Sequence, residues 1–157
     1  MHAVTYSAIL LSLVLSKHQL ILVLVTAVLQ WLLGALWYGV IFRKSWRKLV
    51  GFAEGEKPKN QIFGMVTFLV ACLLLSYVLA QFLSLMQHLA GVAGLMGPST
   101  FTAGMKLGII CWLGFLAPPL FTQHIYENRR VNLFAINVSY WLLAMALGGG
   151  LLAAFHD

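Results

Sequence analysis

The sequence predicts an all-α integral membrane protein, and three observations support this fold class. Hydrophobic residues make up 61% of the 157 residues and charged residues only 9%, whereas a soluble domain has about 25% charged residues. Four apolar stretches are each long enough to cross a hydrocarbon core of about 30 Å as a helix, and none contains Asp or Glu. The alternation of polar and apolar residues that is typical of a β-barrel is absent from the sequence.

The four spans are expected to form two antiparallel hairpins within a single transmembrane domain over residues 1–157. Their approximate bounds are 20–42, 61–86, 100–125 and 131–155. The link YENRR between the last two spans is short, which predicts that these helices are antiparallel neighbours. Gly104 and Gly108 form a GxxxG pattern, and Ala144 and Gly148 repeat its spacing. Both patterns favour close helix packing, either within the chain or between copies in a homo-oligomer.

The residues before the first span are apolar but short. Residues 1–16 would reach about 24 Å as a helix, less than the hydrocarbon core of about 30 Å. We expect a short helix that lies at the outer interface or inserts obliquely. A fifth span that turns at Lys17–Gln19 is the alternative, and it would place the amino terminus inside.

The first span ends in an aromatic pair, Trp37–Tyr38, followed by a basic cluster. Aromatic residues favour the membrane interface and Lys and Arg favour the cytoplasmic side. Residues 42–52 then continue as an amphipathic pattern with Trp46, Leu49 and Val50 on one face. We expect this segment to lie flat, with its apolar face in the acyl boundary and its cations near anionic lipids.

The distribution of positive charge predicts the orientation. Of ten Lys and Arg residues, six lie between the first and second spans and two between the third and fourth. Because short basic loops stay in the cytoplasm, we expect a bacterial inner-membrane protein with its carboxyl terminus outside. The net charge of +6 then reflects this topology and the anionic inner leaflet, so membrane lipids are the expected partners and nucleic acid is not.

Several polar and aromatic residues are predicted at one depth in the inner half of the membrane, which we call the inner layer. Its members are Trp37, Tyr38, Pro118, Pro119, Asn137, Tyr140 and Trp141. The proline pair bends its helix and frees backbone carbonyls, for which Asn137, Tyr38 and Tyr140 are candidate donors. The favoured interpretation is a structural polar layer, with Gln30 bonding across helices nearer the midplane.

The alternative is a small ligand pocket that opens to the cytoplasm and suits an anionic or amphipathic molecule. Six cations would surround its mouth and form what we call the basic rim. They are Arg43, Lys44, Arg47, Lys48, Arg129 and Arg130.

Other reactive residue types form no recognisable catalytic pattern. Cys72 and Cys111 are isolated in different spans without a C-x-x-C motif and are expected to be buried packing residues. Lys106 is expected to extend to the outer headgroups, and Glu127 to pair at the inner face. We expect no metal and no cofactor, with a weak alternative of an outer metal cluster formed by three histidines. These are His18, His88 and His156.

Three runs of the sequence resemble one known family. They are LGALWYGVIFRKSWRKLVG at 33–51, WLGF at 112–115 and ENRRVNLFAINVSYWL at 127–142. These runs are similar to the bacterial domain-of-unknown-function family numbered 1761, over roughly residues 20–155. Ser139 stands where that family has a small residue such as Gly, and residues 1–16 lie outside its pattern. The resemblance implies a small four-span membrane protein and no particular activity.

Three function classes follow, in order of preference. The first is a non-enzymatic membrane protein that acts as a homo-oligomer or accessory partner. The second is a small transporter or channel whose substrate path runs through the inner layer. An enzyme on a lipid or isoprenoid substrate comes last, because the spans lack acid–base residues.

Overall fold

The computed structural model describes residues 15–53, 56, 60–93 and 100–155, of which residues 90–93 are described by their main chain alone. Every regular element in these ranges is helical. The elements are, in order, α2 (Lys17–Leu36), the π-helical turn η1 (Trp37–Ile41), α3 (Arg43–Val50), α4 (Gln61–Ala93), α5 (Phe101–Cys111), the π-helical turn η2 (Trp112–Leu116), α6 (Ala117–Tyr126) and α7 (Val131–Ala154). Four continuous helical segments are long and apolar enough to cross a membrane: Lys17–Ile41, Gln61–Leu89, Phe101–Tyr126 and Val131–Ala154. The predicted fold class, an all-α membrane protein with four spans, is confirmed.

The first span begins at a well-defined cap. The Ser16 hydroxyl accepts a hydrogen bond from the Gln19 main-chain N–H at 3.2 Å, and the Gln19 side chain accepts one from the Ser16 N–H at 2.8 Å. This reciprocal pair satisfies two donors that a helix start leaves free. Lys17–Gln19 therefore form the first turn of α2, whereas the alternative with a fifth span required a turn there. The helix expected over residues 1–16 lies outside the described residues except for its last two positions.

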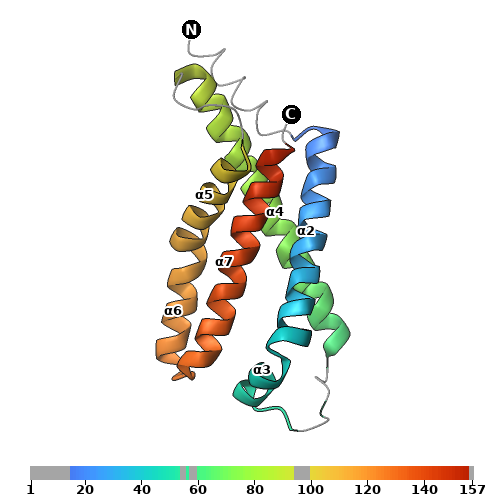
Figure 1. Ribbon diagram of the computed structural model, residues 1–157, viewed down its shortest axis with the longest axis vertical. Helices are drawn as coiled ribbons and strands as arrows, with labels where there is room; N and C mark the ends of the chain where they lie inside the picture. Colours follow the sequence, from blue (N-terminus) through green and yellow to red (C-terminus); the bar gives the residue numbers. More distant parts are fainter. Residues whose placement is uncertain (1–14, 54–55, 57–59, 94–99, 156–157) are drawn as a thin grey trace.

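The bundle is built around α7. Figure 1 shows α7 between α5–α6 on one side and α2 on the other, with α4 crossing obliquely behind. The most extensive packing is between α5 and α7, followed by α2 and α4. Both α3 and the turn between α6 and α7 lie at one end of the bundle (Figure 1). The basic segments that the sequence assigns to one membrane face are thus at the same end of the fold.

Glycines allow α5 and α7 to approach closely. A Cβ atom at Gly104 would fall on the main-chain oxygen of Gly149, and one at Gly108 would fall on that of Met145. The GxxxG pattern is therefore used inside the chain. Gly148 faces the Gln30 and Thr26 side chains of α2. The second small-residue pattern, at Ala144 and Gly148, therefore also packs against a helix of the same chain.

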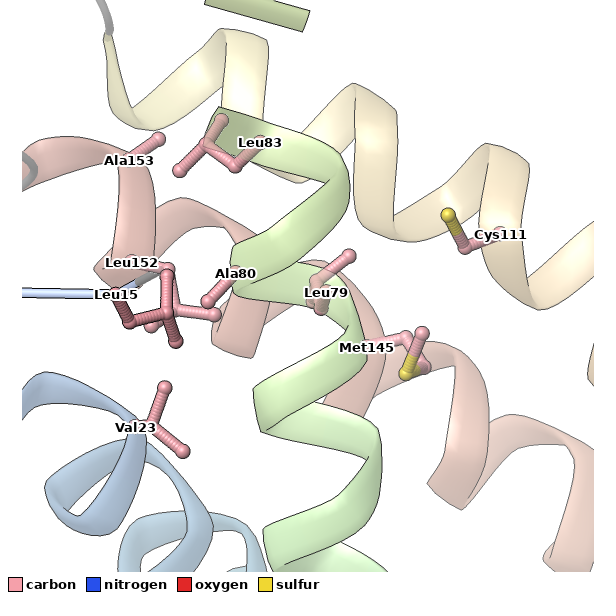
Figure 2. Packing of buried hydrophobic residues seen from close by; sticks show 9 residues of the cluster. All are labelled: Leu15, Val23, Leu79, Ala80, Leu83, Cys111, Met145, Leu152 and Ala153. Atoms are coloured by element: carbon pink, nitrogen blue, oxygen red, sulfur yellow. The ribbon is translucent and has the colours of Figure 1, made fainter. Parts of the chain in front are cut away.

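Apolar packing concentrates away from the α3 end. Figure 2 shows a cluster to which α2, α4, α5 and α7 all contribute, together with Leu15 just before α2. Its members are Leu15, Val23, Leu79, Ala80, Leu83, Cys111, Met145, Leu152 and Ala153. Many large apolar side chains on the outside of the bundle remain exposed, as expected for helices that face hydrocarbon.

Spans one and three each contain a π-helical turn with a similar sequence, W-Y-G-V-I in η1 and W-L-G-F-L in η2. The N–H of Phe42 bonds to the Trp37 oxygen in η1, and that of Ala117 bonds to the Trp112 oxygen in η2. Pro118 and Pro119 are the second and third residues of α6, one residue after η2, where a missing main-chain N–H is best tolerated in a helix. Single π-helical turns often occur at functional sites, which directs attention to the surroundings of η1.

Candidate functional site

A buried hydrogen-bond network around Gln30 lies next to the inner layer and includes its member Tyr140. The Gln30 amide nitrogen donates to the Ala144 main-chain oxygen at 3.0 Å, and its side-chain oxygen accepts from the Ser76 hydroxyl at 3.0 Å. The Tyr140 hydroxyl donates to the Gln30 main-chain oxygen at 2.9 Å. Gln30 is 4% exposed, and Ser76 and Tyr140 are 0% exposed. Since these polar groups are satisfied by α2, α4 and α7 themselves, the network connects three helices.

Trp37 extends the same connection toward the inner end. Its indole nitrogen donates to the main-chain oxygen of Ile136 at 3.1 Å, which joins η1 to α7. The rings of Trp37 and Tyr140 lie 6.5 Å apart between centroids, and Tyr140 also contacts Phe68 at 5.7 Å. Trp37 and Tyr140 thus hold the helices together, in line with the structural interpretation of the layer.

Tyr38, Asn137 and Trp141 are placed differently, because they line a cavity. The Tyr38 hydroxyl donates to the Asn137 side-chain oxygen at 3.3 Å, and all three side chains are half-buried. The cavity has a volume of about 400 Å³ between α3, α4, α6 and α7, and Arg129 lies on its wall. The inner layer therefore divides into a packed part and a part that faces open space.

The two prolines do not join either part. Pro118 and Pro119 are exposed on the outside of α6. The Pro118 oxygen accepts a hydrogen bond from the Thr122 hydroxyl at 2.6 Å, four residues along the same helix. The Tyr38 and Tyr140 hydroxyls, two of the expected donors, bond to the Asn137 side chain and to the Gln30 main-chain oxygen instead, so they do not serve the carbonyls that the prolines free.

A larger cavity of about 680 Å³ lies between η1, α3 and the start of α4. Aromatic and apolar side chains form its wall, while Arg43, Arg47 and the amides of Asn60 and Gln61 lie on its polar side. It shares Tyr38, Trp46 and Phe68 with the smaller cavity, so these three rings separate the two spaces. The apolar wall includes Trp31, Met65 and Phe68.

Small residues create the space in this wall. Gly39 on η1 and Gly64 on α4 both line the larger cavity, and an added Cβ at either would meet nothing within 4 Å. Gly34 is different, because a Cβ there would strike the Phe68 ring and lie 3.2 Å from the Tyr140 hydroxyl. Gly34 thus lies where the Phe68 ring fills the space between the helices, and Gly39 and Gly64 lie where the cavity is open.

The basic rim is only partly assembled at these cavities. Arg43 and Arg47 line the larger cavity and Arg129 the smaller one. Lys44, Lys48 and Arg130 are exposed and line neither of them. The six cations therefore lie at one end of the bundle but do not encircle one mouth.

The three arginines at the cavities differ in their partners. Arg47 donates to the main-chain oxygens of Ala53, at 3.2 Å, and Glu56, and its guanidinium lies 5.3 Å from the centre of the Phe52 ring. Arg129 pairs with Glu127. Among the residues that the structure describes, none pairs with Arg43.

Glu127 lies at the end of α6, outside the membrane-spanning segments. Hydrogen bonds from the Gln123 amide and then from the Arg129 guanidinium hold the pKa of its carboxyl below the usual range. The carboxylate therefore stays charged at neutral pH.

Among the residues that the structure describes, the histidines do not form a metal site. His18 and His88 lie on α2 and α4 near the outer end, and His156 is outside the described residues, so the outer cluster is not assembled from what the structure describes. In the described ranges, no group of three His, Cys, Asp or Glu side chains could hold a metal ion. His124 lies at the inner end, stacked on Phe134 with 4.9 Å between ring centroids.

Sequence reasoning missed two contributors to the site. Phe68 contacts Tyr140 and Trp141 and lines both cavities, but nothing distinguishes it from other apolar residues of the second span. Trp46 was expected in the acyl boundary, whereas its ring packs against Tyr38 with 5.7 Å between centroids. The amphipathic pattern of 42–52 identifies the apolar face of α3 but not what that face contacts.

Comparison with known proteins gives one match. The model of the family described as "Protein of unknown function (DUF1761)" matches residues 21–153. No curated protein and no solved structure matches the chain.

Proposed function

The chain belongs to the DUF1761 family of proteins of unknown function, and from this premise we propose that it is a non-enzymatic membrane protein that holds an amphipathic ligand at the α3 end of its bundle. The observation that carries this proposal is the cavity of about 680 Å³ beside η1. Its volume falls in the range of about 300–1,000 Å³ typical of small-molecule sites, and its wall is mainly apolar with a few polar groups at one end.

The proposed orientation places this end in the cytoplasm of a bacterium, with the protein in the inner membrane and the carboxyl terminus outside. By sequence, eight of the ten Lys and Arg residues belong to the connections between spans one and two and between spans three and four. The six of them that the structure describes belong to α3 and the turn between α6 and α7, both at the α3 end. The cavity would then open at the inner leaflet, where amphipathic molecules are concentrated in the membrane interface.

An accessory role, without catalysis, suits the residues that surround the cavity. Arginines, amides and aromatic rings line it, and none of its described lining residues is a carboxylate, histidine or cysteine that could act as a general acid, base or nucleophile. We include homo-oligomerisation in the proposal, but the glycine patterns do not support it because α5, α7 and α2 already use them within the chain.

Mass spectrometry of the intact protein released from lipid nanodiscs tests the proposed function. We expect the natural protein to retain a bound small molecule, and the same spectrum reports the oligomeric state. The double variant Gly39→Leu, Gly64→Leu should lose that molecule, because the new side chains have room and occupy the open part of the cavity.

Gly114→Leu is the matched control. Gly114 occupies the same third position in η2 as Gly39 does in η1, and a Cβ there also meets nothing within 4 Å. It lines neither of the two cavities at the α3 end. Equal ligand retention in the double variant and the control would contradict the proposed site.

A further inference from the structure

We propose that the ligand is a single-chain amphiphile with an anionic phosphate or carboxylate headgroup bound by Arg43, with its chain in the groove between η1 and α4. This inference rests on the proposed function and specifies the chemical class of the ligand. Three features of the larger cavity lead to it: a guanidinium without a partner among the described residues, described wall residues that include no carboxylate, and an apolar groove.

The first feature is the state of the two arginines on the cavity wall. Arg47 is occupied by the Ala53 and Glu56 carbonyls and by the Phe52 ring. Arg43 lines the same cavity, four residues earlier on α3, and no partner for it is found among the described side chains and carbonyls. A guanidinium presents a planar pair of donors that fits a phosphate or carboxylate in a bidentate manner.

The second feature is the charge of the wall. None of the described residues that line this cavity is acidic, and Arg43 and Arg47 are its charged members. Among the described lining residues an anionic headgroup would meet attraction from Arg43, whereas a cationic one would be repelled. The carboxylate of Glu56, which follows Arg47 in this region, is bonded to the Ala53 main-chain N–H at 2.9 Å. The side-chain amides of Asn60 and Gln61 lie on the same polar side and can donate further hydrogen bonds.

The third feature is the shape of the apolar part. α2 and α4 pack together where Phe68 fills the space over Gly34, and they leave an opening at Gly39 and Gly64. The Trp31 indole donates to the Met65 main-chain oxygen at 3.1 Å, which holds one wall of this opening in place. The cavity volume of about 680 Å³ limits how much of a lipid it can hold, from which we infer a single hydrocarbon chain, and the apolar lining favours such a chain.

Binding of two lysolipids with the same chain tests the headgroup. The probes are 1-oleoyl-lysophosphatidylglycerol, which is anionic, and 1-oleoyl-lysophosphatidylcholine, which is zwitterionic. Each is titrated into the full-length protein in a neutral detergent, and bound stoichiometry is measured by native mass spectrometry. We expect one tightly bound equivalent of the anionic lysolipid and weaker binding of the zwitterionic one.

Arg43→Gln should weaken binding of the anionic lysolipid roughly tenfold and that of the zwitterionic one less, because the zwitterionic phosphate can also reach Arg43 while its choline is repelled by Arg47. Lys48→Gln is the control, because it removes the same charge from the same exposed helix at a position that does not line the cavity. An equal loss in Lys48→Gln would show a diffuse effect of surface charge and would overturn the inference. Equal affinity of the natural protein for both lysolipids would overturn it as well.

The two proposals fail in different ways. If the double variant Gly39→Leu, Gly64→Leu binds both lysolipids as the natural protein does, the cavity itself is not the site and the proposed function is wrong. If the double variant loses both lysolipids but Arg43→Gln weakens the binding of both equally, the cavity is the binding site and the proposed anionic class of ligand is wrong. Tight binding of diacyl phosphatidylglycerol with no binding of its lysolipid would refute the single-chain requirement.

Discussion

Gln30 and Tyr140 are joined across the bundle at the main chain: the Tyr140 hydroxyl donates to the Gln30 oxygen at 2.9 Å, and both side chains are buried. Gln30 in turn donates from its amide to the Ala144 oxygen, one helical turn beyond Tyr140. Each helix therefore supplies a donor to a carbonyl of the other. In hydrocarbon such groups find no water to replace a lost partner, so this pair is a point of strong constraint between α2 and α7.

Removal of the Tyr140 hydroxyl should lower stability more than removal of the Tyr38 hydroxyl. Tyr140→Phe deletes a buried 2.9 Å hydrogen bond, whereas Tyr38→Phe deletes a 3.3 Å bond at a half-buried position. We expect Tyr140→Phe to cost about 1 kcal/mol, and Tyr38→Phe clearly less. Thermal unfolding in detergent measures both, and an equal or reversed order would contradict the division of the inner layer into packed and cavity-facing parts.

Gln30→Leu should be at least as destabilising as Tyr140→Phe. The change removes the bonds to Ala144 and Ser76 and leaves the Ser76 hydroxyl without its inter-helix acceptor. A loss of about 1–2 kcal/mol is expected in the same unfolding assay. Thr67→Val is the control, because the Thr67 hydroxyl bonds only within α4, to the Phe63 oxygen at 2.8 Å, at an exposed position. A control as unstable as Gln30→Leu would argue against a special role for the network.

Gly108→Leu should disrupt the packing of α5 on α7. A side chain there would occupy the position of the Met145 main-chain oxygen, which cannot move aside as a flexible side chain can. We expect a loss of about 3 kcal/mol or failure to accumulate as folded protein, as is typical of severe overpacking. Gly114→Leu, with open space around the added Cβ, should fold and melt like the natural protein. Normal stability of Gly108→Leu would mean that these helices are not in close contact.

Glu127 should make stability depend on acid pH. Its pKa is held below the ordinary 4.5 in the folded state by the Gln123 amide and the Arg129 guanidinium, so folding favours the charged form. The contribution is therefore complete above the ordinary pKa and is lost as the pH falls through the lowered value. Melting temperatures between pH 6 and pH 3 should decline less in Glu127→Gln than in the natural protein. A steeper decline in the variant would contradict the assigned direction.

Much of the fold was predictable because hydrocarbon imposes a simple rule on sequence. Long apolar runs without carboxylates locate the spans, and the short YENRR link predicts that α6 and α7 are neighbours. The inner layer was partly predictable for the same reason, since Trp37, Tyr38, Asn137 and Tyr140 stand out as polar or aromatic residues at similar depth.

Other parts depend on helix rotation, which composition does not reveal. Depth placed Pro118 and Pro119 with the layer, but α6 is rotated so that both are exposed and Thr122 bonds the Pro118 oxygen. These helices are apolar on almost every side, so the sequence does not show which side of a helix faces the bundle. Phe68 therefore could not be distinguished from its neighbours. The cavity depends on the absence of side chains at Gly39 and Gly64, and the space that this leaves can be recognised only once the positions of the helices are known.

The central claim is that the end of the bundle with α3, the cavities and the basic rim faces the cytoplasm. Single cysteines at Lys48 or Arg130, in a chain with Cys72 and Cys111 replaced by alanine, can be probed with a membrane-impermeant maleimide in intact bacterial cells. We predict no labelling at either position until the cells are permeabilised, and labelling without permeabilisation of a cysteine at exposed Thr102, near the opposite end. Labelling of Lys48→Cys or Arg130→Cys in intact cells would contradict the orientation and with it the access of inner-leaflet ligands to the cavity.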